Sequence, residues 1–120
     1  MANPNIANLT SILGQTSTLD LTTTNNPLVT NVSNSGAVYK LNTLIVANVD
    51  GANTVAIDIQ WLPNGGAPIY LAKSMNLPAK TSITIIDKNI PIYLTEGVSI
   101  YAVASASGDA QAIVSYEVIS

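Results

Sequence analysis

The chain has no histidine, no cysteine and no arginine, and only 9% of its 120 residues are charged. The lack of histidine removes the side chain that most often serves as a general acid or base. The lack of cysteine removes disulfide frameworks, thiolate zinc sites and redox motifs together. These absences predict no catalytic residues, no cofactor and no metal site, and therefore a protein that is not an enzyme.

Positive charge is also too sparse for some kinds of binding. The cations are four scattered lysines, and the formal net charge is −3. Nucleic-acid binding depends on clustered cations that displace counterions from phosphates, and the same argument applies to an anionic membrane surface. We therefore expect neither nucleic acid nor a membrane as a partner. The N-terminus lacks a basic region followed by an apolar stretch, so no secretion signal is predicted.

The acidic residues do not suggest a site either. Four of the seven carboxylates, Asp50, Asp87, Glu96 and Asp109, fall in predicted turns, where solvated acidic side chains are common. A hydrolytic pair would need two of them facing each other across a cleft. Residues 50–53, DGAN, lack the further oxygen ligands and the closing Glu of a calcium loop. We interpret Asp50-Gly51, like residues 107–109, as a hairpin turn between two strands.

Apolar residues make up 48% of the chain, and most of them alternate with Ser, Thr and Asn. Such alternation, with a turn signal every 8 to 12 residues, is typical of a β-sandwich or small barrel. The sequence predicts an all-β, single-domain antiparallel β-sandwich of about eight strands, either jelly-roll or immunoglobulin-like. The candidate strands are residues 16–24, 28–32, 37–49, 54–62, 68–75, 81–86, 91–94, 98–105 and 112–119.

The longest candidate strand has an unusual second half. Leu41, Thr43 and Ile45 share one face of residues 37–49, and Leu44 and Val46 make the other face apolar as well. A strand that is apolar on both faces is either central and covered on both sides, or is covered on its outer face by a partner. We therefore predict Leu44 and Val46 as subunit-interaction residues.

Residues 1–15 differ from the rest, because Asn, Ala, Pro and Gly break the alternation. Its apolar positions are Ile6, Leu9, Ile12 and Leu13. One interpretation is an N-terminal arm that orders against a neighbouring subunit, and the other is a flexible terminus. We predict an arm at residues 1–15 that uses these four side chains, followed by a β-sandwich domain at residues 16–120.

Two further features leave alternatives open. Trp61 lies on the alternating apolar face of residues 54–62, which favours a core position over a sugar-binding platform with the tyrosines. The low charge favours a surface packed into an assembly, because interface cores are depleted of charge. A neutral Asn, Thr and Ser coat is the alternative.

Four segments carry a resemblance to a known family. They are residues 39–51 (YKLNTLIVANVDG), 92–97 (IYLTEG), 104–107 (ASAS) and 114–119 (VSYEVI). Across residues 37–119 the chain resembles small virion structural proteins of tailed phages, especially those infecting marine cyanobacteria. The family often has Asp after the Glu-Gly, where this chain has Val98. These motifs belong to strands and turns and carry no catalytic meaning.

The resemblance implies a non-enzymatic β-sandwich component of a virion. Its first implication is a capsid decoration or cement protein on the capsid exterior, bridging and stabilising neighbouring capsid subunits. The partners would then be the major capsid protein or other virion proteins, with a homo-oligomer expected. A neck, collar or tail ring or fibre component is the alternative. A carbohydrate-binding module for host attachment is the alternative from another class.

Overall fold

The computed structural model describes residues 11–120 as nine β-strands joined by turns and loops. Eight of the nine strands lie within or close to the candidate ranges, and the first begins earlier than predicted. Within the described residues no helix has the length and apolar character needed to cross a membrane. The strands are β1 (Ile12–Asp20), β2 (Asn26–Thr30), β3 (Val38–Asn48), β4 (Val55–Leu62), β5 (Ile69–Leu77), β6 (Ser82–Ile86), β7 (Ile92–Leu94), β8 (Ser99–Ala104) and β9 (Ala110–Ile119).

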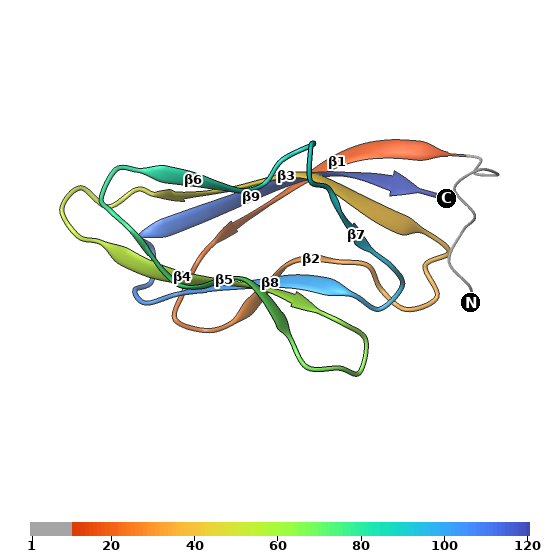
Figure 1. Cartoon of the computed structure of the whole chain (residues 1–120), viewed down its shortest axis with the longest axis horizontal. Helices are drawn as coiled ribbons and strands as arrows, with labels where there is room; N and C mark the ends of the chain where they lie inside the picture. The colour runs from red at the N-terminus through yellow and green to blue at the C-terminus, as the bar shows by residue number, and fades with distance from the viewer. Residues whose placement is uncertain (1–10) are drawn as a thin grey trace.

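The strands form two antiparallel sheets that face each other (Figure 1). One sheet has five strands in the order β1-β9-β3-β6, with β7 also paired to β3. The other has four strands in the order β2-β8-β4-β5. The prediction of an all-β, antiparallel sandwich is therefore confirmed.

The pairing pattern is nested, and this decides between the two expected architectures. The first strand, β1, pairs with the last, β9, and β2 pairs with β8. Inside these pairs, β3 pairs with both β6 and β7, which together act as one interrupted strand, and β4 pairs with β5. Nested antiparallel pairs divided between two sheets are the jelly-roll arrangement. An immunoglobulin-like order would place the strands differently.

The core lies between the sheets and follows the predicted alternation. On β4, Val55, Ile57 and Ile59 are buried, and Trp61 packs against the same cluster from its edge. From the five-stranded sheet, alternate residues of β9 such as Val114 reach the same cluster. This alternation gives each strand one face in the core and one face outward.

A β-bulge in β3 corrects the prediction for Leu44 and Val46. Leu41 pairs with Tyr116 and Thr43 pairs with Ser115, so Asn42 is an extra residue in the register. A bulge of this kind shifts the alternation by one residue. As a result Leu41, Leu44 and Val46 all point into the core, and each is 0% exposed. Leu44 and Val46 therefore pack against the opposite sheet and are not surface residues.

Two predicted hairpins are instead connections between the sheets. Asp50-Gly51 joins β3 to β4, and residues 107–109 join β8 to β9, and in both cases the two strands belong to different sheets. The Asp50 carboxylate accepts hydrogen bonds from the backbone amides of Ala52 and Asn53, which shapes the first of these turns. Both segments are turns, as predicted. The strands on either side of each turn do not pair with each other, because they belong to different sheets.

Two buried asparagines fasten the ends of the sandwich. The Asn31 amide donates to the carbonyl oxygens of Ala37 and Leu94, each at 2.9 Å. The Asn48 amide donates to the carbonyl oxygens of Asn53 and Leu77, at 2.9 and 2.8 Å. Buried polar groups are stable when they are hydrogen-bonded in this way. Asn31, which follows β2, thus binds the last residue of β7, and Asn48, which ends β3, binds the last residue of β5.

Candidate interaction surface

The six residues predicted to contact other subunits do not form one group. Leu44 and Val46 are in the core. Ile12 and Leu13 lie on strand β1 and are 56% and 53% exposed. Ile6 and Leu9 lie outside the described residues. The strand begins at Ile12 and not after residue 15, because β9 pairs with residues 12–15 and Gly14 fits into that ladder.

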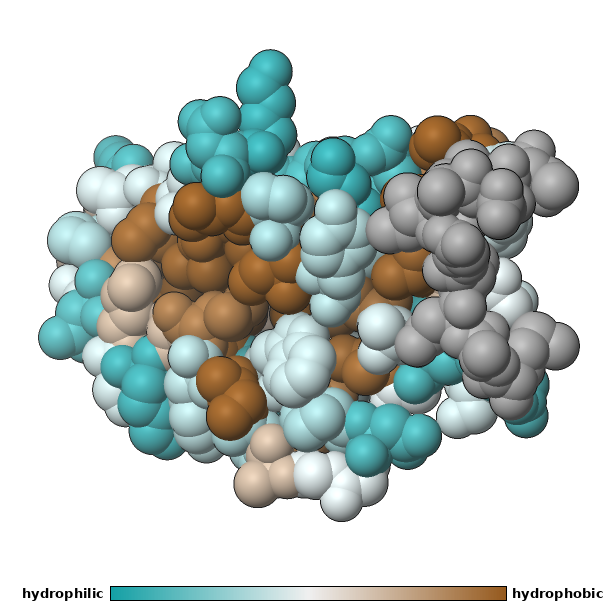
Figure 2. Space-filling model, turned by 45° about the vertical axis from the view of Figure 1, so that its right-hand side comes forward, coloured by the Kyte–Doolittle hydropathy of each residue, from teal (hydrophilic) through white to brown (hydrophobic). Residues whose placement is uncertain are grey.

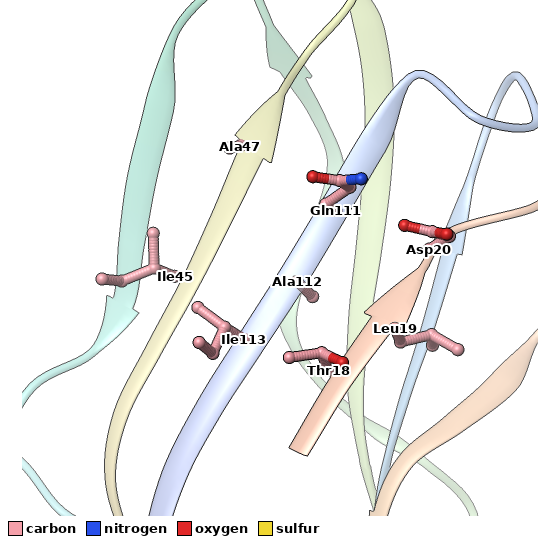
Figure 3. A pocket seen from close by; sticks show the side chains of 8 residues that line it. All are labelled: Thr18, Leu19, Asp20, Ile45, Ala47, Gln111, Ala112 and Ile113. Carbon is pink, nitrogen blue, oxygen red and sulfur yellow. The ribbon is translucent and has the colours of Figure 1, made fainter. Parts of the chain in front are cut away.

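The outward surface of the five-stranded sheet has two central rows of uncharged side chains. Thr18, Ile113 and Ile45 lie side by side across β1, β9 and β3, as Figure 3 shows. The adjacent row joins Thr16 to Ser115, whose hydroxyl oxygens are 3.4 Å apart, and continues onto β3. We call these two rows the outer face. Its residues are Thr16, Thr18, Thr43, Ile45, Thr84, Ile113 and Ser115.

Charged side chains border the outer face. Beyond one row, Lys40 lies opposite Glu117 on the neighbouring strand. Beyond the other row lies Asp20, opposite Gln111. Opposite charges placed directly across a sheet attract weakly, so this border adds little repulsion toward an approaching surface. The outer face is thus a neutral strip with charge at its two ends.

Two open hollows lie on this side of the sheet. The first has a volume of about 400 Å³, and its walls include Thr18, Ile45 and Ile113. The second has a volume of about 570 Å³, and its walls include Thr16, Thr43 and Ser115, with Lys40 and Lys88. Hydroxyl, amide and aliphatic groups form most of their walls, with Asp20 at the first hollow and Lys40, Lys88 and Glu117 at the second.

The carboxylates of the described residues do not converge on a centre. Across residues 11–120, no three acidic side chains are grouped so as to hold a metal ion. The backbone amides of Asn53 and then Ala52 hold the pKa of the Asp50 carboxyl below its ordinary value, which marks a turn-forming role. Asp58 lies 3.5 Å from the Lys73 ammonium and accepts a hydrogen bond from the Ser74 amide.

The Lys73 ammonium also lies 4.4 Å from the centre of the Tyr70 ring. A side-chain hydrogen bond with Tyr70, followed by the charge of Asp58, raises the pKa of Lys73. These groups lie on β4 and β5 at the edge of the four-stranded sheet, where exposed charge pairs of this kind contribute little to stability.

A second apolar surface lies where the edges of the two sheets face each other, beside β5, β6 and β7. Leu71, Met75, Ile83, Ile85 and Ile92 are only partly buried there and pack against the core. Figure 2 shows apolar surface extending across this side of the molecule. These side chains form the open side of the sandwich core.

Trp61 belongs to the border of this opening. Its ring packs against the core cluster, and its indole N–H donates to the carbonyl oxygen of Tyr93 at 3.4 Å. Both contacts fit the core position that the alternation favoured. Tyr93 and Tyr70 are more exposed, at 43% and 42%.

Sequence reasoning missed the outer face and the two buried asparagines. The outer face depends on the bulge at Asn42, which no residue pattern marks. Asn31 and Asn48 lie inside the candidate strands 28–32 and 37–49, where the sequence does not mark an asparagine as buried. Their burial depends on the carbonyl oxygens of Leu94 and Leu77, which lie at the ends of strands distant in the sequence.

Comparison with known proteins finds structures of similar fold and no protein family. No protein-family model and no curated protein matches the chain. Among solved structures, it is similar to a protein of Bacillus endospore appendages, described as disulfide-linked pili. The TM-score is 0.50 and the identity 9%, over 99% of this chain and 95% of that one. At this identity the likeness shows the fold alone.

Two further similar chains come from structures of infectious bursal disease virus. For the Gx strain, the identity is 13% and the TM-score 0.43, over 91% of this chain and 31% of the viral one. For the Gt strain, the identity is 12% and the TM-score 0.38, over 92% and 31%. This chain therefore spans about a third of the length of each viral protein.

Proposed function

We propose that this protein is a non-enzymatic structural subunit of a tailed-phage virion, most specifically a capsid decoration or cement protein on the capsid exterior. The observation that carries the proposal is the outer face, two adjacent rows of hydroxyl and aliphatic side chains without charge. Such a surface has the composition of an interface core, which is depleted of charged residues. The family resemblance of residues 37–119 supplies the virion context.

The outer face would bind a capsid surface at low desolvation cost. Ile45 and Ile113 would transfer apolar area out of water, which is favourable at about 25 cal/mol per Å². The threonine and serine hydroxyls can rotate to donate or accept, so they can replace hydrogen bonds to water with hydrogen bonds to a partner. Moving even an uncharged polar group out of water without a new hydrogen bond costs about 2–7 kcal/mol. Burying an unpaired charged side chain in the same place would cost more.

The similar pilus protein differs in its chemistry of assembly. That protein is described as forming disulfide-linked pili, whereas this chain contains no cysteine. An assembly built from it would therefore contain no disulfide between subunits. The uncharged outer face offers non-covalent contacts in their place.

Sedimentation of purified protein with purified phage particles or assembled empty shells tests the proposal. Wild-type protein should sediment with them, and Ile113→Lys should lose that binding because it places a charge at the centre of the outer face. Val103→Lys is the matched control, because Val103 lies opposite Asp58 in the other sheet and should bind as wild type does. Failure of the wild type to bind would contradict the virion role. Equal binding by both variants would show that the outer face is not the contact.

A further inference from the structure

Strand β1 forms one edge of the five-stranded sheet and is unusually regular for an edge strand. All nine of its residues, Ile12 to Asp20, pair with β9 in one unbroken register. Its residues 12–19 carry no charge and no proline. On the inner side the Tyr116 hydroxyl donates to Gln15 at 3.1 Å and lies 3.2 Å from the Ser17 hydroxyl, which fastens the strand to β9.

The register shows which backbone groups of β1 face away from the sheet. Ser11 and Ser120 exchange two backbone hydrogen bonds, and the Leu21 amide donates to Ala110. Because hydrogen-bonded pairs alternate along an antiparallel ladder, odd-numbered residues bond to β9 and even-numbered residues present N–H and C=O groups at the free edge. No described residue pairs with that edge. The even-numbered residues are Ile12, Gly14, Thr16, Thr18 and Asp20.

The other sheet edges carry the features that prevent strand addition, and β1 does not. β2 has five residues, with Pro27 and a register shift next to it. β5 carries Lys73 and, at Ser74, a residue with φ of 49° that interrupts its regular backbone. β6 and β7 are short, and Pro91 directly precedes β7. Short strands, proline, bulges and lysine are the usual protections of an edge, so the unprotected edge of β1 stands out.

We propose that β1 pairs antiparallel with β1 of a second copy of this chain, joining two five-stranded sheets into one continuous sheet. Centred on Thr16, this register places Thr18 opposite Gly14 and Asp20 opposite Ile12 of the other copy. Each of the five even-numbered residues then forms a hydrogen-bonded pair, for about ten backbone hydrogen bonds across the two-fold axis.

Charge and apolar exposure both favour this partner and this direction. Antiparallel pairing separates the two Asp20 carboxylates by the length of the strand, whereas parallel pairing in register would place them side by side. The same register sets exposed Leu13 against Leu19 of the second copy, which itself packs on the core cluster. Non-hydrogen-bonded pairs have the closest side chains in an antiparallel sheet. The pairing would thus cover an aliphatic side chain that is 53% exposed in one copy.

This inference does not depend on the virion role, and the mass of the full-length protein in solution tests it. Light scattering across a concentration series should show a dimer. Thr16→Pro removes an outward N–H that β9 does not use, which an edge strand tolerates. Each of the two copies loses one hydrogen bond across the dimer axis, so the dimer dissociation constant should rise at least about tenfold. Ser115→Lys, one strand inward on the outer face, should leave the dimer intact.

A wild type that stays monomeric up to millimolar concentration would overturn the proposal. So would a dimer that survives Thr16→Pro, or one that Ser115→Lys dissociates, because each assigns the contact to another surface.

If Thr16→Pro does not fold, hydrogen exchange of the wild-type amides tests the same contact. The amides of Thr16 and Thr18 should be protected at high protein concentration and exchange freely on dilution. Exchange that is fast at every concentration, or protection that does not change on dilution, would overturn the proposal.

Discussion

Replacing Asn31 tests how the jelly-roll end is held together. Asn31 is 0% exposed, and its side chain makes three hydrogen bonds: its amide donates to the carbonyl oxygens of Ala37 and Leu94, and its oxygen accepts from the Ser35 hydroxyl at 2.6 Å. At roughly 1 kcal/mol for each bond, Asn31→Ala should lower the free energy of unfolding by about 3 kcal/mol. For a chain of this size that corresponds to a fall in Tm of roughly 12 °C.

The assay is urea unfolding followed by circular dichroism, with exposed Asn76→Ala as the matched control. The control should change stability by less than about 0.5 kcal/mol. Asn31→Asp should destabilise at neutral pH at least as much as Asn31→Ala, because a carboxylate cannot donate and would face two carbonyl oxygens. A loss below 1 kcal/mol for Asn31→Ala, or an Asn31→Asp variant as stable as wild type, would refute the assigned hydrogen bonds.

Three further predictions follow from burial and charge. Leu44→Ala should lose about 2–5 kcal/mol and Ile45→Ala less than half as much in denaturant unfolding, since the bulge turns Leu44 inward; equal losses would contradict that assignment. Asp50 has a lowered pKa in the folded state, so it contributes stability that is present above its unfolded pKa and is lost as pH falls through its folded pKa. Asp50→Asn should flatten the acid limb of a stability–pH profile, and an unchanged profile would count against the turn contacts. Trp61→Ala should destabilise by at least about 2 kcal/mol by circular dichroism, and a stable variant that had lost glycan binding would support the carbohydrate alternative.

The fold was largely predictable because alternation and turns are local signals. Residues 54–62 alternate between apolar and polar side chains, and β4 buries Val55, Ile57 and Ile59, which share the face of Trp61. Strand order was not predictable, because Asp50-Gly51 looks the same whether the chain turns back into the same sheet or crosses to the other one. The pairing of β1 with β9 links residues about a hundred positions apart, and no local pattern records it.

The interaction residues were harder to predict than the strands. The prediction that Leu44 and Val46 contact a partner rests on a strand that is apolar on both faces, and it assumes unbroken alternation. The bulge at Asn42 breaks it, so that the outward apolar residue is Ile45. The sequence shows Ile12 and Leu13 as apolar residues in an irregular terminus, and the structure places them on an exposed edge strand. Their contact with another subunit stays a prediction.

The measurement that tests the central claim most directly is the copy number of this protein in purified phage particles. Quantitative mass spectrometry against the major capsid subunit gives that ratio without any engineered variant. A decoration or cement role predicts a ratio near one. A ratio of a few per cent would place the protein in the neck, collar or tail, and its absence from the particles would contradict the virion role altogether.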